Sequence, residues 1–348
     1  MFKEMDIDEL LNSESDEFVL VDVRSPSEYE EMSIPGSYNI PVFNDEERAE
    51  VGTLYKQVSK ETATDRGLEL FSAKLPAFIK QFKELPGKKV VYCWRGGMRS
   101  KAAATFLDLM GFETHRIKGG VRAYRRWVMK QLETLEMKPK AFVLNGGTGT
   151  GKTEILHRLQ SDRIPVLDIE GLANHRGSVF GGIGLAPHNQ KTFDSLLVRE
   201  ITRLEQHPFV IFEAESKRVG KVQLPPFLLN KKEQATHIFI ELPIKERVAH
   251  LMKEYRLHEH HEEFTQAFRR IKRRIHSPVA NTIEEELKNG NYEYILELLL
   301  EYYYDPRYIH TAGKYAEDQK IILKVNSIDE ASEKVKRLLI DEKNIIRV

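Results

Sequence analysis

Short apolar runs alternate with longer segments of helical periodicity through the first 137 residues of the chain. Three of these runs have the length and β-branched content of buried strands, at residues 18–23, 89–92 and 114–117. Four segments repeat apolar residues at a spacing near 3.6 and predict helices, at residues 44–60, 65–82, 100–110 and 121–137. Between them, residues 34–41 have the Pro and Gly content of a turn. Strands that alternate with helices are typical of a parallel α/β sheet.

The same alternation restarts after Lys138, Pro139 and Lys140, where the proline prevents a helix from continuing. We therefore expect two domains, residues 1–137 and residues 138–348. In the second, the pattern predicts strands at residues 141–144, 164–167, 209–212 and 237–242. Helices are expected at residues 152–160 and 190–206, through most of 245–304 and, exposed, at 329–341. The predicted fold class is α/β, with two parallel-sheet domains and helical additions to the second.

Composition excludes several classes of protein. Lys and Arg number 53, as do Asp and Glu, so no net charge draws the whole chain to nucleic acid or anionic lipid, and such a partner would need a local basic patch. Apolar residues at 41% and charged residues at 30% are typical of a folded chain. No apolar run approaches about 18 residues and the first residues are acidic, which predicts a cytoplasmic location. The single cysteine, Cys93, excludes an intrachain disulfide and a Cys-rich zinc site.

A glycine-rich segment between the first strand and the first helix of the second domain matches the phosphate-binding pattern G-x-x-x-x-G-K-[ST]. Its residues are Gly146, Gly147, Thr148, Gly149, Thr150, Gly151, Lys152 and Thr153. Glycines let backbone N–H groups approach phosphate oxygens, and the helix N-terminus adds positive potential. The Lys152 ammonium would neutralise phosphate charge, and the Thr153 hydroxyl could hold Mg²⁺. A purely structural turn is the alternative, and the flanking strand and helix argue against it.

A P-loop that hydrolyses a nucleotide usually has a second acid for the metal. The candidates at predicted strand ends are Asp168, Glu213 and Glu215. None is an ordinary Asp that ends a strand of four apolar residues, so the evidence for ATP hydrolysis is weak, and a Glu in such a place is as often a helix cap or an ion-pair partner. The motif therefore predicts a phosphate ligand, which could be a diphosphate other than a nucleotide.

Cys93 follows a predicted buried strand and opens a loop that contains two glycines and two arginines before a helix. In this position the sulfur would face the helix N-terminus and the N–H groups freed by Gly96 and Gly97. Together with Arg95 and Arg99, these groups favour thiolate over thiol and would stabilise a persulfide or selenide anion. A lone cysteine is more often an inert buried side chain, but this loop favours a group-transfer cysteine.

Four strings in the first 135 residues resemble the rhodanese domain. They are the string DVRSPSEY from Asp22 to Tyr29, the string Ile34-Pro35-Gly36, the Cys93 loop, and Lys118-Gly119-Gly120 with Trp127 after it. The resemblance implies that Asp22 and Arg24 brace the sheet. It also implies that Cys93 carries transferable sulfur in a loop of backbone amides.

With the P-loop string and His175-Arg176-Gly177-Ser178 added, the order of motifs resembles the tRNA 2-selenouridine synthase family over nearly the whole chain. This resemblance implies a rhodanese-like domain followed by a P-loop NTPase-like domain. It implies a transferase that geranylates 2-thiouridine at the wobble position of tRNA, with geranyl diphosphate as donor, and then replaces the sulfur by selenium from selenophosphate. A thiocarbonyl is a poor leaving group until it is alkylated, which agrees with that chemistry. The P-loop is then expected to hold the diphosphate of the geranyl donor.

A neutral chain that binds tRNA needs local basic surface, and three clusters offer it. The candidates are Arg269, Arg270, Lys272, Arg273 and Arg274 in the first cluster, Arg122, Arg125 and Arg126 in the second, and Lys217, Arg218 and Lys221 in the third. Such runs are more often solvated helix faces, so each cluster alone is a weak signal.

Three further segments have two interpretations each. Residues 175–184, which include the RNA-binding candidate Arg176, have the glycines of a mobile lid or of a plain surface loop. The tyrosines at residues 302–304 could stack on bases, although an aromatic run beside leucines is more often core. His258, His260 and His261 lack metal-ligand spacing and are expected to be exposed loop residues.

Two other functions fit the motifs less well. One is a P-loop kinase of a small molecule with a regulatory rhodanese half, which would turn over ATP without tRNA. The other is a nucleotide-gated adaptor in which Cys93 only senses oxidants. The tRNA-modifying transferase is favoured because it gives both the basic clusters and the cysteine loop a use.

Overall fold

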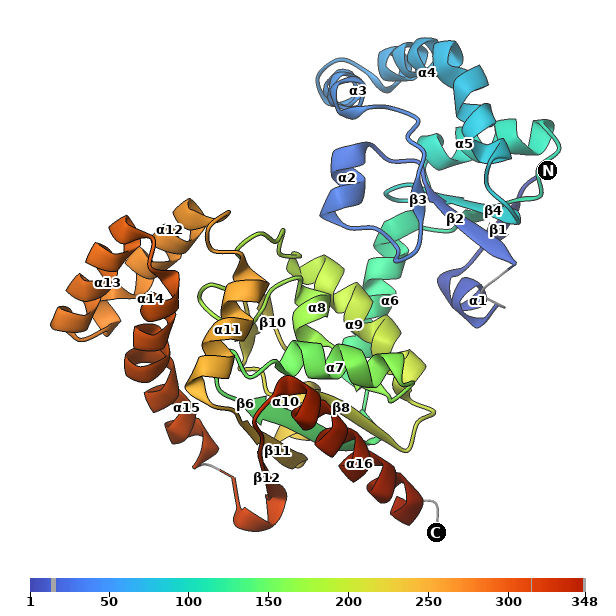
Figure 1. Cartoon of the computed structure of the whole chain (residues 1–348). Helices are drawn as coiled ribbons and strands as arrows, with labels where there is room; N and C mark the ends of the chain where they lie inside the picture. Colours follow the sequence, from blue (N-terminus) through green and yellow to red (C-terminus); the bar gives the residue numbers. More distant parts are fainter. Residues whose placement is uncertain (14–16, 314, 347–348) are drawn as a thin grey trace. The chain divides into compact units, whose positions relative to one another are not determined.

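The computed structural model describes residues 1–13, 17–313 and 315–346, and the chain divides into two compact units. Unit 1 comprises Met1–Thr134 and Asp194–Leu196, and unit 2 comprises Leu135–Phe193 and Leu197–Val348. Each unit contains a five-stranded sheet with helices around it (Figure 1). The predicted α/β fold class with two parallel sheets is therefore confirmed. In the part of the chain that the structure describes, no helix is both long and apolar enough to cross a membrane.

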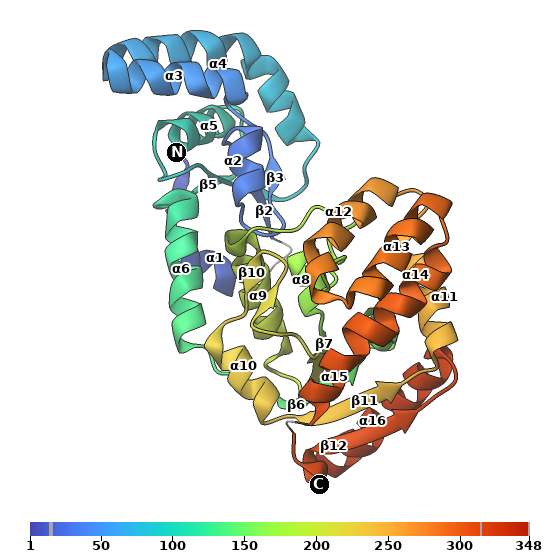
Figure 2. The same cartoon turned by 90° about the vertical axis from the view of Figure 1, so that its left-hand side faces the viewer.

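The sheet of unit 1 is entirely parallel, in the order β1-β5-β4-β2-β3. Its strands are β1 (Lys3–Met5), β2 (Phe18–Asp22), β3 (Tyr38–Asn39), β4 (Lys88–Tyr92) and β5 (Thr114–Ile117). Its helices are α1 (Ile7–Asn12), α2 (Pro26–Glu31), α3 (Asp45–Gln57), α4 (Lys60–Lys83), α5 (Met98–Leu109) and α6 (Gly120–Thr134). Figure 2 shows α3 and α4 side by side as a helical hairpin.

Two short strands of unit 1 were not predicted. The turn expected at residues 34–41 contains β3, whose two residues pair with Val21 and Asp22 of β2. The strand β1 has the sequence Lys-Glu-Met and pairs with β5 at the edge of the sheet. Neither segment is long or apolar enough to show a strand pattern, so both are strands because a neighbouring strand supplies their hydrogen bonds.

An ion pair between Asp22 and Arg24 lies in the interior of unit 1, with both side chains fully buried. The Arg24 guanidinium donates two hydrogen bonds to the Asp22 carboxylate, Nε at 3.0 Å and Nη2 at 2.6 Å, and a third to the Met32 carbonyl. Asp22 Oδ1 also accepts the Arg24 backbone N–H at 2.9 Å. The pair therefore links the end of β2 to the residue that follows α2, which agrees with the bracing role that the rhodanese resemblance implied.

The main sheet of unit 2 is also parallel, in the order β12-β11-β6-β8-β7. Its strands are β6 (Lys140–Gly146), β7 (Val166–Leu167), β8 (Phe209–Glu213), β11 (Thr236–Glu241) and β12 (Lys320–Lys324), while β9 (Arg218–Val219) and β10 (Val222–Gln223) form a small antiparallel pair. The edge strand β12 was not predicted, because it is half-exposed and begins and ends with lysine.

The helices of unit 2 lie around this sheet and in a separate group. The helices outside the separate group are α7 (Lys152–Ser161), α8 (Ile169–Ala173), α9 (Gln190–Leu204), α10 (Pro226–Glu233) and α16 (Ile328–Ile346). The others are α11 (Ile244–Tyr255), α12 (His261–Ile271), η1 (Lys272–Arg274), α13 (Ser277–Asn289), α14 (Tyr292–Leu299), η2 (Leu300–Tyr304), α15 (Asp305–Ala312) and η3 (Glu317–Gln319). Helices α11 to α14 share a core of their own, so the predicted helical additions are present (Figure 1).

The segment at residues 175–184 belongs to that helical core. Phe180 and Ile183 are buried in it, and the Phe180 ring stacks on Phe264 of α12 with centroids 4.7 Å apart. The Ser178 hydroxyl lies 3.1 Å from the Tyr255 hydroxyl. The glycines of this segment therefore shape a turn that is anchored by packing, and neither an open lid nor a plain surface loop describes it.

We expect Arg24→Ala to lower the free energy of unfolding of unit 1 by about 3–5 kcal/mol, because it leaves a buried carboxylate without its partner. Urea denaturation followed by tryptophan fluorescence measures this effect, since both tryptophans, Trp94 and Trp127, belong to unit 1. Arg66→Ala is the matched control, because its pairs with Glu50 and Glu69 lie at the surface and should cost less than about 1 kcal/mol. Equal losses in the two variants would contradict the bracing role.

Candidate functional site

The Cys93 loop joins the carboxyl end of β4 to the N-terminus of α5. Cys93 is only 3% exposed, and its Sγ accepts the Gly97 N–H at 3.2 Å and lies 3.2 Å from the Ser100 hydroxyl. A parallel strand leads into a helix here, and the donor to the sulfur is the N–H of Gly97, the N-cap residue of α5, which has no partner within the helix. The sulfur thus faces the helix N-terminus, as predicted.

A glycine of the Lys-Gly-Gly string holds this loop from the other side. Gly120 has a φ of +59°, and a Cβ there would lie 2.1 Å from the Cys93 carbonyl oxygen. The same carbonyl accepts the Val121 N–H at 2.9 Å at the start of α6. Close approach of the α6 backbone therefore fixes the position of Cys93, and only glycine fits at residue 120.

The two arginines of the loop have different surroundings. Arg99 is half-buried and pairs with both carboxylate oxygens of Glu28 at the N-terminus of α2, with Nη2 to Oε1 at 3.2 Å. Glu28 thus compensates most of the Arg99 charge. Arg95 is exposed, so its charge is screened by water but is available to a bound anion. Backbone donors therefore contribute more to an anion site at Cys93 than the arginine count alone suggested.

The P-loop joins β6 to α7 in unit 2, in the strand-loop-helix context that the motif requires. Gly149 and Gly151 have φ values of +83° and +73°, which L side chains rarely adopt. The Lys152 ammonium donates to the Gly146 carbonyl at 2.9 Å, and the Thr150 hydroxyl donates to the Gly147 carbonyl at the same distance. Side chains of the loop thus donate to two of its own carbonyls, and the N-terminus of α7 offers N–H groups to a phosphate.

Arg247 and Asp305 support the P-loop from the helical part of unit 2, and sequence reasoning missed them. The Arg247 Nε donates to the Thr148 carbonyl at 2.9 Å. The other two guanidinium nitrogens form a bidentate pair with Asp305, at 2.9 and 2.6 Å. The two residues lie about a hundred or more positions after the motif and belong to different helices, so no local pattern could have connected them with it.

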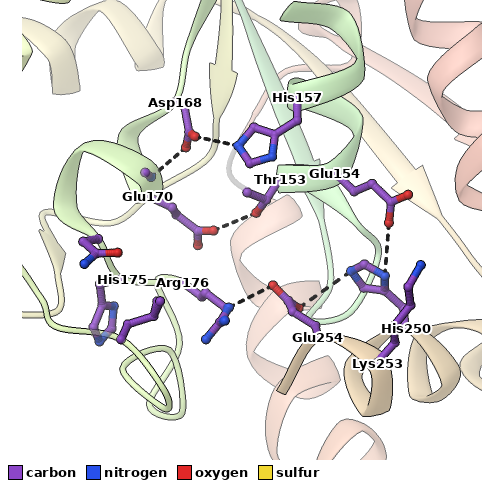
Figure 3. A pocket seen from close by; sticks show the side chains of 13 residues that line it. Thr153, Glu154, His157, Asp168, Glu170, His175, Arg176, His250, Lys253 and Glu254 are labelled. Carbon is purple, nitrogen blue, oxygen red and sulfur yellow. Dashed lines mark hydrogen bonds and ion pairs between the residues drawn. The ribbon is translucent and has the colours of Figure 1, made fainter. Parts of the chain in front are cut away.

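A pocket of about 400 Å³ opens beside the N-terminal turn of α7 (Figure 3). Most of its lining residues are of polar types, and they come from α7, α8, the segment after α8, and α11. The residues are Thr153, Glu154, His157, Asp168, Glu170, Gly171, Asn174, His175, Arg176, Leu185, His250, Lys253 and Glu254. Among the predicted site residues, Thr153, Asp168 and Arg176 therefore meet in one place.

Glu170 is the carboxylate that contacts the P-loop threonine, and sequence reasoning passed over it. The Thr153 hydroxyl donates to Glu170 Oε2 at 2.9 Å. A hydroxyl and a carboxylate side by side fit Mg²⁺, which keeps several waters and takes further ligands from phosphate oxygens. Among the described residues, no group of three or more His, Cys, Asp or Glu could hold a metal alone. The residues therefore fit a magnesium ion that arrives with a phosphate ligand.

Three carboxyls near the P-loop favour their protonated forms. Burial, the Asp168 charge and the Glu170 charge raise the pKa of Glu213 well above its usual value. Burial, and then the neighbouring Glu170, raise the pKa of Glu215 to about 8, although Lys152 opposes the shift. Burial also raises the pKa of Glu170. The close packing of Glu170 and Glu215 is visible at Gly177, where a Cβ would lie 2.4 Å from one carboxyl oxygen and 2.6 Å from the other.

Asp168 and Glu213 both accept backbone N–H groups of α8. Asp168 caps α8, since its Oδ1 accepts the Gly171 N–H at 2.7 Å, and its Oδ2 lies 2.9 Å from His157 Nε2. Glu213 is 1% exposed, its Oε1 accepts the Glu170 N–H, and it is absent from the pocket lining. Asp168 is thus a helix cap that also lines the pocket.

Two charged side chains on the far wall of the pocket hold each other in place (Figure 3). Arg176 Nε pairs with Glu254 at 3.2 Å, and its Nη1 donates to the Ile183 carbonyl at 2.9 Å. His250 lies between Glu154 at 3.5 Å and Glu254 at 3.7 Å, and burial lowers its pKa. Arg176 is therefore a pocket residue, and its contact with RNA stays a prediction.

The remaining candidates lie at the surface of their units. In the first cluster, at the end of α12 and in η1, Lys272 is half-buried and pairs with Glu284, whereas Arg269, Arg270, Arg273 and Arg274 are exposed. Arg122 and Arg126 are exposed on α6, with Arg125 half-buried, and Lys217, Arg218 and Lys221 are exposed around β9. His258 and His261 are exposed and His260 is half-buried, which largely agrees with the prediction. Of the tyrosines at residues 302–304, Tyr303 is core and Tyr302 is exposed.

Comparison with known proteins identifies related chains over both units. The model of the tRNA 2-selenouridine synthase AAA domain matches residues 139–338, and the rhodanese-like domain model matches residues 6–127. A tRNA 2-selenouridine synthase of Nitrosomonas europaea is 36% identical over 273 residues, covering 76% of this chain and 69% of that protein. The one of Bdellovibrio bacteriovorus is 32% identical over 346 residues, covering 87% and 91%. The one of Hydrogenovibrio crunogenus is 33% identical over 326 residues, covering 85% and 89%.

The raised pKa of Glu215 predicts a pH-dependent stability. The folded chain keeps a proton on Glu215 up to about pH 8, whereas the unfolded chain releases it near pH 4.5. This contribution is therefore fully present below about pH 4.5 and is lost as the pH rises toward 8. Glu215→Gln keeps a neutral side chain at every pH, so the Tm of the unchanged protein should fall relative to that of the variant between about pH 5 and 8. Parallel Tm curves would contradict the shifted pKa.

Proposed function

The chain belongs to the tRNA 2-selenouridine synthase family, as its motifs indicated, and from that premise we propose that it converts wobble 2-thiouridine of tRNA to 2-selenouridine in two steps, one in each unit. The P-loop of unit 2 holds geranyl diphosphate for the first step. The Cys93 loop of unit 1 serves the second step, in which selenium from selenophosphate replaces the sulfur. The substrate is tRNA whose wobble base carries 2-thiouridine.

The observation that carries this proposal is the state of the carboxyls around the P-loop. Nucleotide hydrolysis needs an ionised acid for the metal or for the attacking water. Burial favours the protonated forms of Glu213 and Glu215, and it raises the pKa of Glu215 to about 8. Burial also raises the pKa of Glu170, the carboxyl beside Thr153, and Asp168 caps a helix. A phosphate cradle with such neighbours suits a reaction in which diphosphate is the leaving group and the nucleophile comes from the other substrate. This favours transfer over an ATP-dependent kinase.

In the first step the thiocarbonyl sulfur bonds to C1 of the geranyl group. The C1–O bond breaks, diphosphate departs with the electron pair, and the uridine N3 proton is released. Lys152, the N-terminal N–H groups of α7 and the P-loop backbone stabilise the charge that develops on the diphosphate. Mg²⁺, held by Thr153 with Glu170 beside it, would supply further charge neutralisation when bound.

In the second step the selenium of selenophosphate bonds to C2 of the alkylated base. The C2–S bond breaks and geranylthiolate leaves with the electron pair, after which water releases the phosphoryl group as phosphate. The Gly97 N–H and the Ser100 hydroxyl beside Cys93 Sγ supply donors for a soft anion. We assign the handling of the chalcogen anion to Cys93, with Arg95 as the exposed cation near it and Arg99 positioned by Glu28.

The exposed basic clusters on α6, around β9 and at the end of α12 supply the local positive surface that a neutral chain needs for tRNA. Their role is electrostatic, so affinity for tRNA should fall as salt rises.

Lys152→Ala should lower geranylation of a 2-thiouridine anticodon stem-loop RNA by about a hundredfold or more, because the developing diphosphate charge loses its main cation. Mass spectrometry of the RNA after incubation with geranyl diphosphate measures the product. Lys288→Ala is the control, since Lys288 is exposed in the last turn of α13. Geranyl transfer at the unchanged rate in Lys152→Ala would refute the assignment of the donor to the P-loop.

Cys93→Ser should retain geranylation and lose 2-selenouridine formation by about a hundredfold or more, because a serine hydroxyl does not stabilise or carry a soft chalcogen. The geranylated RNA should accumulate. The assay supplies selenophosphate and follows both products in the same sample. Selenouridine formation at the unchanged rate would remove Cys93 from the mechanism.

A further inference from the structure

Unit 1 contains a second pocket, of about 660 Å³, beside the Cys93 loop, and the second step proposed above involves only the part of its lining that this loop supplies. One wall is the loop itself, with Cys93, Trp94 and Met98, and α5 behind it. The other wall is the α3–α4 hairpin, through side chains such as Val51 and Phe71. The volume is in the range of pockets for small organic ligands.

The lining of this pocket combines many apolar side chains with a few charged ones, all of which are basic. Four of the large hydrophobic side chains that are exposed on the chain line it, namely Tyr55, Leu68, Trp94 and Met98. Every charged residue in its described lining is a cation: Arg48, Lys56, Lys60, Arg95 and Arg99. Arg48 and Arg99 both pair with Glu28, so the charge offered to a ligand comes mainly from Lys56, Lys60 and Arg95. A gathering of exposed apolar side chains marks a binding surface. The cations complement a ligand whose apolar part is attached to a polyanion.

We propose that this pocket binds the ten-carbon geranyl chain on the wobble sulfur, so that geranylated tRNA docks with its C2–S bond beside Cys93 and its phosphates on the basic rim. This inference rests on the proposed two-step function and names how the second step selects its substrate. The geranyl group leaves in that step as part of geranylthiolate. The apolar wall next to Cys93 holds this group while the C2–S bond breaks.

The pocket of unit 2 is a poor alternative site for the geranyl group. Its lining residues are mainly carboxylates and histidines, with Arg176 and Lys253, and these suit polar groups better than a hydrocarbon chain. Free geranyl diphosphate is the other source of a geranyl group, and the cations of this lining could also pair with its diphosphate. The P-loop already offers hydrogen-bond donors for phosphate in unit 2, so we assign the geranyl donor there and the alkylated base to unit 1.

The test compares two variants of the full-length protein. Leu68→Asp places a carboxylate in the apolar wall, and since Leu68 is 60% exposed the variant should fold. Leu109→Asp is the matched control, because Leu109 is 73% exposed on α5 and lies outside the pocket lining. The probes are anticodon stem-loop RNAs with S-geranyl-2-thiouridine or S-methyl-2-thiouridine, and Kd is measured without turnover.

The unchanged protein and Leu109→Asp should bind the S-geranyl RNA at least about tenfold more tightly than the S-methyl RNA. Leu68→Asp should lose that preference, retain geranylation of the 2-thiouridine RNA, and accumulate the geranylated product. A preserved preference in Leu68→Asp would overturn the inference. So would a raised KM for geranyl diphosphate in Leu68→Asp, or displacement of S-geranyl RNA by geranyl diphosphate, since either result assigns the pocket to the donor.

Failure of the proposed function is a separate result. An unchanged protein that forms neither geranylated nor selenated RNA would refute the two-step reaction, whereas the binding preference would still be measurable. An unchanged protein that completes both steps, while Leu68→Asp behaves like Leu109→Asp, would refute only the role of this pocket.

Discussion

Both candidate sites depend on one constraint, the exit of a parallel strand into the N-terminus of a helix. A parallel sheet requires a crossover after each strand, so the first N–H groups of the following helix gather at the carboxyl edge of the sheet. In unit 1, β4 delivers Cys93 to the N-terminus of α5, and in unit 2, β6 delivers the P-loop to α7. The two anions differ, one a soft chalcogen and the other a phosphate, but the donors that stabilise them are the same backbone groups.

Most buried charged side chains near the two sites hold the backbone in place, and few of them are available to a ligand. Arg24 with Asp22, Arg99 with Glu28, and Arg247 with Asp305 are paired cations that hold the backbone of a loop or strand end. The carboxyls behind the P-loop are instead buried close to one another, and burial together with the neighbouring carboxyls favours the protonated forms of Glu213 and Glu215. The positive groups aimed at ligand are therefore few, and they are mainly backbone N–H groups and the Lys152 ammonium.

The sequence predicted the two sheets, most strands and helices, and both motif loops, because each of these has a local pattern that burial or phosphate binding requires. It missed β1, β3 and β12, which are short or half-exposed strands that exist through their neighbours. It also passed over Glu170, which contacts Thr153, and did not show that Arg176 pairs with Glu254 in the same pocket. These contacts join separate elements, α7 with α8 and the segment after α8 with α11, and no periodicity within one element predicts a contact between two.

The central claim is that the two steps are separate reactions joined by a geranylated RNA intermediate. The most direct measurement mixes the P-loop variant Lys152→Ala with the cysteine variant Cys93→Ser and supplies 2-thiouridine RNA, geranyl diphosphate and selenophosphate. The account predicts that the mixture forms 2-selenouridine, detected by mass spectrometry, although neither variant alone does so, because one protein makes the intermediate that the other consumes. A mixture that stops at the geranylated RNA, or that forms no product, would contradict it.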